Sequence, residues 1–116
     1  MEIDNGNGYH RVFDTGATRD SDADKLDFDG FFHPTVMIAF SKYMHKNRKL
    51  KDGTLRDSDN WTLGIPQEQY MKSMWRHHID CWCNSKGIET EEDEITNLCA
   101  LMFNVQGLLY EKLRNK

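Results

Sequence analysis

Apolar residues recur at helical spacing in three segments of the chain. The first segment begins at Pro34, a residue favoured in the first turn of a helix, and its pattern continues to about Lys46. Its apolar positions follow i, i+3, i+4 and i+7 spacing: Val36, Met37, Phe40, Tyr43 and Met44. This pattern predicts a helix over residues 34–46.

The second and third segments predict two longer helices. Helix formation restarts at Pro66 and continues to about Asn84, and Gly87 marks the end. The apolar stripe of this helix is Met71, Trp75, His78, Ile79 and Trp82. Thr90 and the acidic residues after it have the form of a capping signal for a third helix over about residues 91–113. Three helices without a convincing strand predict an all-α domain that resembles a helix bundle.

The first thirty residues have no sustained apolar period. They contain four Gly and seven Asp, and eight acidic residues stand against three basic ones. We predict an extended N-terminal arm of turns over residues 1–30, pinned where Phe13, Leu26 and Phe28 can dock, and an all-α domain over residues 31–116.

The composition predicts a thin hydrophobic core and argues against duplex nucleic acid as a partner. Hydrophobic residues make up 38% of the 116 residues, below the usual share, which favours burial by assembly into a homodimer or homotetramer. The net charge of −4 argues against a duplex nucleic-acid binder. Residues 31–60, however, hold six basic against three acidic side chains, which keeps a phosphate-bearing small ligand open.

The chain shows no signal for a membrane or an oxidising compartment. No stretch approaches 18 apolar residues, and the start at Met1 lacks the positive charge of a signal peptide. Cys81, Cys83 and Cys99 have no disulfide-framework spacing. We expect a soluble cytoplasmic protein with free thiols and no membrane partner.

One strip of the third helix is polar or small, although the helix is apolar almost all round between Ile95 and Leu109. The strip residues follow each other at steps of three and four: Asp93, Asn97, Ala100, Asn104, Gly107 and Glu111. Buried polar groups are costly unless paired, so the strip must face a ligand, a metal ion, another subunit or a partner helix. A close helix–helix seam, with Asn97 and Asn104 bonding across it, is an equally good interpretation.

Two polar pairs at i, i+3 spacing are candidates for a metal site. His77 and Asp80 form one pair, and Glu94 and Asn97 form the other. Antiparallel helices that each offer such a pair build carboxylate metal sites in helix bundles, and oxygen ligands favour Mg²⁺ or Mn²⁺. Asp93 is a further candidate ligand.

Three alternatives compete with this assignment. Glu91 or Glu92 can replace Glu94, because the register of this turn is uncertain. Taken alone, Asp80 is better interpreted as an ordinary ion pair with Arg76 at i, i+4. A zinc site would need four convergent ligands from one set: His77, His78, Cys81 and Cys83. It is disfavoured because the two cysteines point to different sides of a helix.

A long basic loop joins the first two helices over residues 47–64, and loops of this length are often functional. Near its end, Trp61 could stack on a nucleobase while Asn60 reads the base edge. An equally good interpretation makes Trp61 an anchor that ties the loop to the core.

Several motifs together resemble, in order, those of phage-type dATP/dGTP diphosphohydrolase domains. They are residues 13–20 (FDTGATRD), 25–28 (KLDF), 32–34 (FHP), 42–44 (KYM), 52–61 (DGTLRDSDNW), 64–66 (GIP), 70–73 (YMKS), 76–77 (RH) with Asp80 and Trp82, and 103–104 (FN). The resemblance covers residues 12–113. This family is a MazZ-like branch of the MazG-like all-α nucleotide pyrophosphohydrolases.

The resemblance implies Mg²⁺-dependent hydrolysis of purine deoxynucleoside triphosphates to monophosphate and pyrophosphate, by a homo-oligomer in the cytoplasm of a phage-infected host. The wider superfamily holds its metals with Glu-x-x-Glu and Glu-x-x-Asp. The corresponding segments here are His77-x-x-Asp80 and Glu94-x-x-Asn97, so two carboxylates are missing. Asp80 with Asp93 or Glu94 would be the ligands.

The resemblance also implies side chains that contact phosphate, and two alternative functions remain open. Lys25, Arg19 and Lys42 are candidates for phosphate contacts. The missing carboxylates suggest a catalytically silent nucleotide-binding or regulatory module as an alternative. A third alternative is a structural protein that docks another chain on the polar strip.

Overall fold

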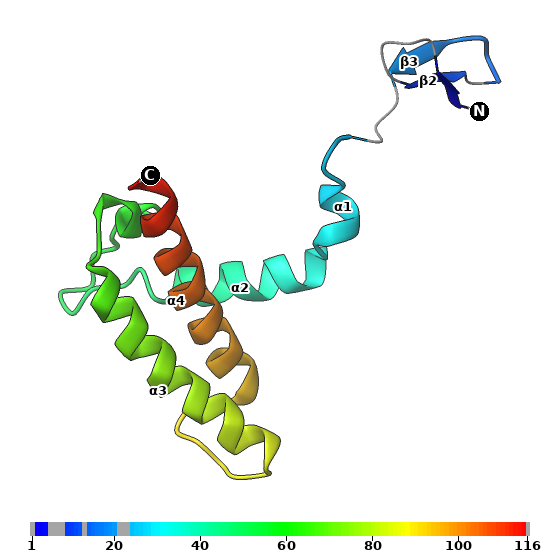
Figure 1. The fold of residues 1–116 in the computed structure, drawn as a ribbon. Coiled ribbons are helices and arrows are strands. Elements are labelled where there is room, and N and C mark those ends of the chain that lie inside the picture. The colour runs from blue at the N-terminus through cyan, green and yellow to red at the C-terminus, as the bar shows by residue number, and fades with distance from the viewer. Residues whose placement is uncertain (1, 5–8, 13, 21–23, 116) are drawn as a thin grey trace. The chain divides into compact units, whose positions relative to one another are not determined.

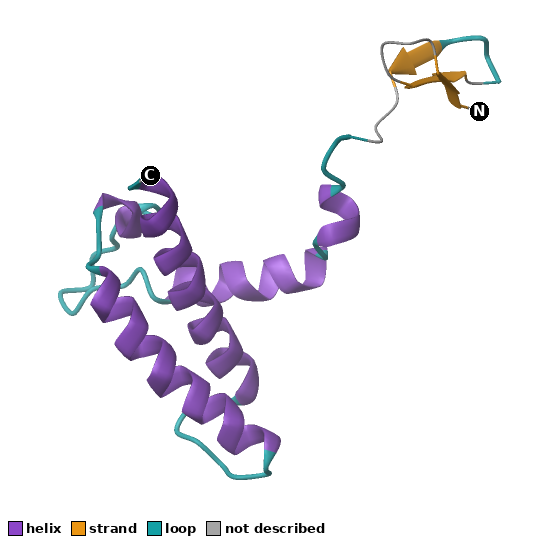
Figure 2. Cartoon of the chain, in the orientation of Figure 1, coloured by secondary structure: helices purple, strands orange, loops and turns teal. Residues whose placement is uncertain are grey.

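The computed structural model describes residues 2–4, 9–12, 14–20 and 24–115, and it divides into two units (Figure 1). The units are Met1–His33 and Pro34–Lys116. Helices dominate the described residues (Figure 2), so the predicted all-α fold class is confirmed. None of these helices combines the length and the apolar character that crossing a membrane requires.

The N-terminal unit contains three strands that the sequence did not predict. β1 (Glu2–Asp4), β2 (Tyr9–Val12) and β3 (Thr18–Asp20) form an antiparallel sheet in the order β1-β2-β3. Strands of three or four residues are too short for an alternating apolar pattern to be recognised, which explains the error. A short helix, α1 (Phe28–Phe31), follows and is capped by Asp27. Phe13, a predicted docking residue, lies outside the described residues.

The second unit contains the three predicted helices at nearly the predicted bounds. α2 (Pro34–Lys46) is followed by a 3₁₀ turn, η1 (Asn60–Leu63), and by α3 (Gln67–Ser85) and α4 (Glu94–Arg114). α3 and α4 form an antiparallel hairpin, and α2 crosses α4 (Figure 1). η1 packs on α4 as well, so α4 is the helix that every other element of this unit contacts.

The buried face of α4 is the polar and small strip, and α3 packs on it, so the interpretation of that strip as a helix–helix seam is confirmed in part. Its buried members are Asn97, Ala100, Asn104, Gly107 and Glu111. Tyr70 of α3, which is 2% exposed, covers Gly107 so closely that a Cβ there would overlap its ring. Asn97 bonds across the seam as expected, whereas Asn104 donates to the carbonyl of Ala100 in its own helix.

α4 is apolar almost all round, yet much of this apolar surface is exposed. Ile95, Leu98, Val105 and Leu109 are between 44% and 62% exposed. Small residues on the opposite face of α4 let α3 approach closely. The polar and small strip is therefore buried against α3, and these apolar side chains remain exposed. Exposed apolar surface of this extent is typical of an interface.

A set of hydrogen bonds, which we call the latch, ties the connection between α3 and α4 to both helices. The side-chain nitrogen of Asn97, Nδ2, donates to Asn84 Oδ1 at 2.8 Å and to Thr90 Oγ1 at 2.8 Å. The latch residues are therefore Asn84, Thr90 and Asn97. The predicted cap at Thr90 is wrong by three residues: Asp93 caps α4 by accepting from the Thr96 amide at 2.7 Å.

Candidate functional site

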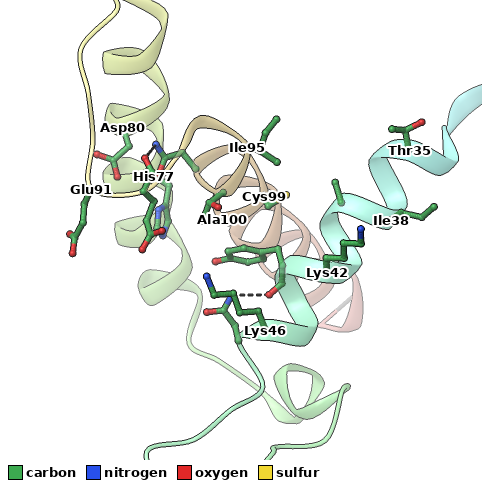
Figure 3. Close-up of a pocket in the computed structure, with 16 residues that line it drawn as sticks. Thr35, Ile38, Lys42, Lys46, His77, Asp80, Glu91, Ile95, Cys99 and Ala100 are labelled. Atoms are coloured by element: carbon green, nitrogen blue, oxygen red, sulfur yellow. Dashed lines mark hydrogen bonds between the residues drawn. The ribbon is translucent and has the colours of Figure 1, made fainter.

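A pocket of about 720 Å³ opens on the helical unit, with walls from α2, α4, and α3 with its connection to α4 (Figure 3). This volume lies in the range of small-molecule sites. The charged and imidazole side chains that line it are Lys42, Lys46, His77, Asp80, Glu91 and Glu92. The pocket therefore gathers candidates that the sequence assigned to a metal and to phosphate.

The acidic side of the pocket comes from α3 and from the connection after it. His77 and Asp80 lie one turn apart on α3, and both are half-buried. Glu91 and Glu92 lie on the connection that the latch holds beside α3. Figure 3 shows Asp80, His77 and Glu91 on the same side of the pocket. Three carboxylates and an imidazole thus share one wall.

The basic side comes from α2. Lys42 and Lys46 are four residues apart, so they share one face of this helix, and both line the pocket (Figure 3). Sequence reasoning selected Lys42 and missed Lys46, although the i, i+4 spacing was a sufficient signal. The pocket therefore has two lysines on one wall and carboxylates on another, and this distribution of charge suits a ligand that carries both a divalent cation and phosphate groups.

Neutral side chains line the part of the pocket between the charged walls. Burial raises the pKa of the Tyr43 hydroxyl, and the neighbouring Cys99 and Glu92 add to the effect. Burial likewise raises the pKa of the Cys99 thiol, with a smaller contribution from Asp93. Both groups therefore stay protonated near neutral pH, and neither is activated as a nucleophile.

The structure separates the five predicted metal ligands into two groups. His77, Asp80 and Asn97 line the pocket, whereas Asp93 and Glu94 are not among the residues that line it. The Asp93 carboxylate caps α4, and hydrogen bonds from Thr96 lower its pKa, helped by the charge of Lys46. The Asn97 amide nitrogen is committed to the latch.

The carboxylates of Asp80, Glu91 and Glu92, which we call the acidic wall, are the right type of ligand for Mg²⁺ or Mn²⁺, but their positions in the structure do not form a metal site. Carboxylate oxygens are the ligands that these ions prefer. Yet no group of three or more His, Cys, Asp or Glu side chains in the described part of the chain is placed to hold a metal ion. Glu91 and Glu92 are exposed side chains on a connection, so their rotamers are free to change when a cation arrives.

The two structural alternatives for these residues find no support. Arg76 and Asp80 both lie in the described part of the chain, and the Arg76 guanidinium donates to Ser73 Oγ at 2.9 Å and forms no ion pair with Asp80. Burial raises the pKa of the Cys81 thiol, and the carboxylates of Asp80 and Glu94 raise it further. No group of three or more His, Cys, Asp or Glu side chains in the described ranges is placed to hold zinc.

A second pocket, of about 270 Å³, contains the predicted base-binding residues. Asn60 and Trp61 line it together with Arg48, and it shares Tyr43 and Asn47 with the larger pocket. The two pockets are therefore neighbours.

Trp61 is also an anchor of the kind that the alternative interpretation expected. Its ring meets Tyr110 edge to face at 5.1 Å and Phe103 at 6.3 Å between centroids. The ring is half-buried, so part of it packs against α4 while part faces the second pocket.

Three remaining candidates lie elsewhere. Arg19 is in β3 and Lys25 precedes α1, both in the N-terminal unit, so their contacts with phosphate stay a prediction. Asn104 is buried in the seam and lines neither pocket.

Comparison of the chain with family models, with curated proteins and with solved structures finds no match.

Proposed function

We propose that this protein is a Mg²⁺- or Mn²⁺-dependent diphosphohydrolase of purine deoxynucleoside triphosphates, releasing a monophosphate and pyrophosphate. The observation that carries the proposal is that Asp80, Glu91 and Glu92 line the same pocket as Lys42 and Lys46 and come from different elements than the two lysines. A metal–triphosphate complex matches this pocket, because its cation suits the carboxylates and its phosphate oxygens suit the lysines. The ordered motifs that resemble dATP/dGTP diphosphohydrolases give independent support.

Each wall has a separate task in this proposal. Asp80, Glu91 and Glu92 would hold the cation, with His77 beside them, and a divalent ion there neutralises phosphate charge and makes a water molecule a better nucleophile. Lys42 and Lys46 bind phosphate oxygens and stabilise the charge that develops on the leaving pyrophosphate. No side chain has to form a covalent intermediate.

The second pocket supplies a place for the base. It adjoins the phosphate-binding pocket through Tyr43 and Asn47, so a nucleotide whose phosphates lie by the lysines can place its base near Trp61. The exposed part of the indole offers a stacking surface, and the amide of Asn60 offers a donor and an acceptor for a base edge.

The test is a turnover assay with each deoxynucleoside triphosphate in the presence of Mg²⁺ or Mn²⁺, with products separated by anion exchange. The proposal expects dATP or dGTP to yield the monophosphate and pyrophosphate. Asp80→Asn should abolish turnover while the fold is retained, and Glu68→Gln, which removes an exposed carboxylate elsewhere on α3, should not. Absence of any monophosphate at micromolar enzyme contradicts the proposal.

A catalytically silent nucleotide-binding module is the second candidate. It is favoured by one observation: no three metal-binding side chains are grouped within the described ranges of the chain. This function predicts that dATP or dGTP raises the melting temperature, by an amount that grows with ligand concentration over Kd, while no product forms. Turnover that depends on Asp80 rules it out.

A further inference from the structure

Part of the long loop between α2 and η1 forms a short antiparallel hairpin, which we call the basic hairpin (residues 48–56). Lys49 and Leu55 form a bridge between its two arms. Next to this bridge, the backbone nitrogen of Arg56 donates to the carbonyl of Arg48 at 2.9 Å. This register places Arg48 directly opposite Arg56, at a Cα separation of about 5.5 Å.

The two arginines of this pair lie on the same face of the basic hairpin. Residues directly opposite each other in an antiparallel pair share a face, and like charges at such positions are destabilising. Arg48 is half-buried, and both Arg48 and Arg56 line the second pocket. The Arg48 Nε donates to the Arg56 carbonyl at 2.8 Å, which holds the side chain in place without using its two terminal nitrogens. The fold therefore brings two positive charges together in one pocket.

The carboxylates of the loop do not balance this charge. Asp52, in the turn of the hairpin, accepts hydrogen bonds from Thr54 N at 3.0 Å and from Thr54 Oγ1 at 2.6 Å. In the lining of the second pocket, the two guanidinium groups stand beside one carboxylate, that of Asp57. Among the residues that the structure describes, no ion pair joins Arg48 or Arg56 to an acidic side chain. An excess of positive charge in a pocket favours an anionic ligand.

We propose that Arg48 and Arg56 form a phosphate-binding site in the second pocket, separate from Lys42 and Lys46. A guanidinium group binds two oxygens in a planar fork. A phosphate group offers three terminal oxygens to two such forks and carries a charge of about −2, whereas a carboxylate offers two oxygens and a single charge. The Ser58 hydroxyl lines the same pocket and can donate a further hydrogen bond to the phosphate.

The phosphate group can be inorganic phosphate or part of a purine nucleoside monophosphate. Trp61 lines the same pocket as the two arginines, so a monophosphate can stack its base on the indole while its phosphate contacts the guanidinium groups. Inorganic phosphate gains nothing from the ring. Arg48, Arg56 and Ser58 do not line the larger, charged pocket. The inference therefore does not rest on the proposed function, and the site would bind phosphate in a chain that hydrolyses no triphosphate.

The first experiment is equilibrium dialysis in the presence of EDTA, with labelled dAMP and labelled inorganic phosphate as separate probes. We expect Arg48→Gln and Arg56→Gln each to raise the dissociation constant about tenfold, because each removes a charge-assisted, forked contact. Lys51→Gln, the same change of charge near the turn of the hairpin, is the matched control and should not change it. Lys42→Gln combined with Lys46→Gln, which removes the other cationic face, should leave one equivalent of probe bound.

The second measurement is the melting temperature in a buffer without phosphate, which separates a binding role of the arginines from a structural one. Arg56→Gln should leave the melting temperature unchanged or raise it, because the substitution relieves the repulsion between like charges. A lowered melting temperature together with unchanged probe binding would mean that Arg56 only supports the hairpin, and it overturns the proposal.

The two probes identify the source of the phosphate group. Tighter binding of dAMP than of inorganic phosphate, lost in both arginine variants, assigns the site to a nucleotide. Equal binding of the two probes, lost in the same variants, assigns it to inorganic phosphate. The proposal is overturned if neither probe binds, if binding ignores both arginine substitutions, or if Lys51→Gln weakens binding as much as they do, since that result indicates diffuse attraction to the basic loop.

Discussion

At the scale of single residues, Gly107 shows why α4 buries its least hydrophobic face. Its missing side chain makes room for the Tyr70 ring, and Ala100 on the same face is only 4% exposed. A close approach of two helices needs small residues along the line of contact. Spacing identified this strip, but no pattern in the chain could show that an aromatic ring on α3 would occupy it.

Gly107→Ala should destabilise the protein by about 1–3 kcal/mol, because the new methyl group overlaps the Tyr70 ring. Helix propensity alone predicts the opposite sign, since Ala is favoured over Gly by about 1 kcal/mol inside a helix. Urea unfolding of the single variants and of Gly107→Ala with Tyr70→Ala measures the coupling. Additive effects of the two substitutions would contradict the overlap.

The Asp93 cap should make stability depend on pH in acid. Hydrogen bonds from Thr96 lower its pKa below the ordinary value of 3.8, so the cap stabilises the folded state above that value. The contribution is lost as the pH falls through the lowered pKa, because the carboxylate is then protonated in both states. The difference in melting temperature between the wild type and Asp93→Ala should therefore be largest near neutral pH and shrink at the acid end. A difference that persists unchanged below pH 3.8 contradicts this account.

At the scale of the elements, helix bounds were predictable and strands were not. The predicted range of α2 agrees with Pro34–Lys46, because Pro34 and the apolar period both act locally. The cap of α4 was misplaced because Thr90 and Asp93 are both good caps, and only the tertiary hydrogen bonds of the latch decide that Thr90 serves the connection. The acidic wall was predictable only in part, since Glu91 and Glu92 reach the pocket through that same connection.

Asn97→Ala should lower stability by about 2 kcal/mol, because it leaves Asn84 and Thr90 without their shared donor. It should also weaken nucleotide binding more than its stability loss explains, since the latch holds the connection that carries Glu91 and Glu92. Calorimetric titration with dATP and Mg²⁺, well below the melting temperature, separates the two effects. Asn104→Ala, buried in the same seam but outside the pocket, is the matched control. Equal nucleotide affinity in the two variants would contradict a role for the latch at the site.

At the scale of the whole molecule, the elements of the helical unit all pack on one helix, α4. α3, α2 and η1 all contact α4, so the elements of Pro34–Lys116 stabilise one another. A chain that begins at Pro34 should therefore unfold cooperatively within a few degrees of the full-length protein, as differential scanning calorimetry would measure.

The same truncation tests the sequence prediction for Arg19 and Lys25. If these side chains contact phosphate, the truncated chain keeps its melting temperature but loses nucleotide affinity, and Arg19→Gln with Lys25→Gln in the full chain reproduces the loss. Unchanged affinity would restrict the phosphate contacts to Lys42 and Lys46, and a truncated chain that fails to fold would contradict the self-sufficiency of the helical unit.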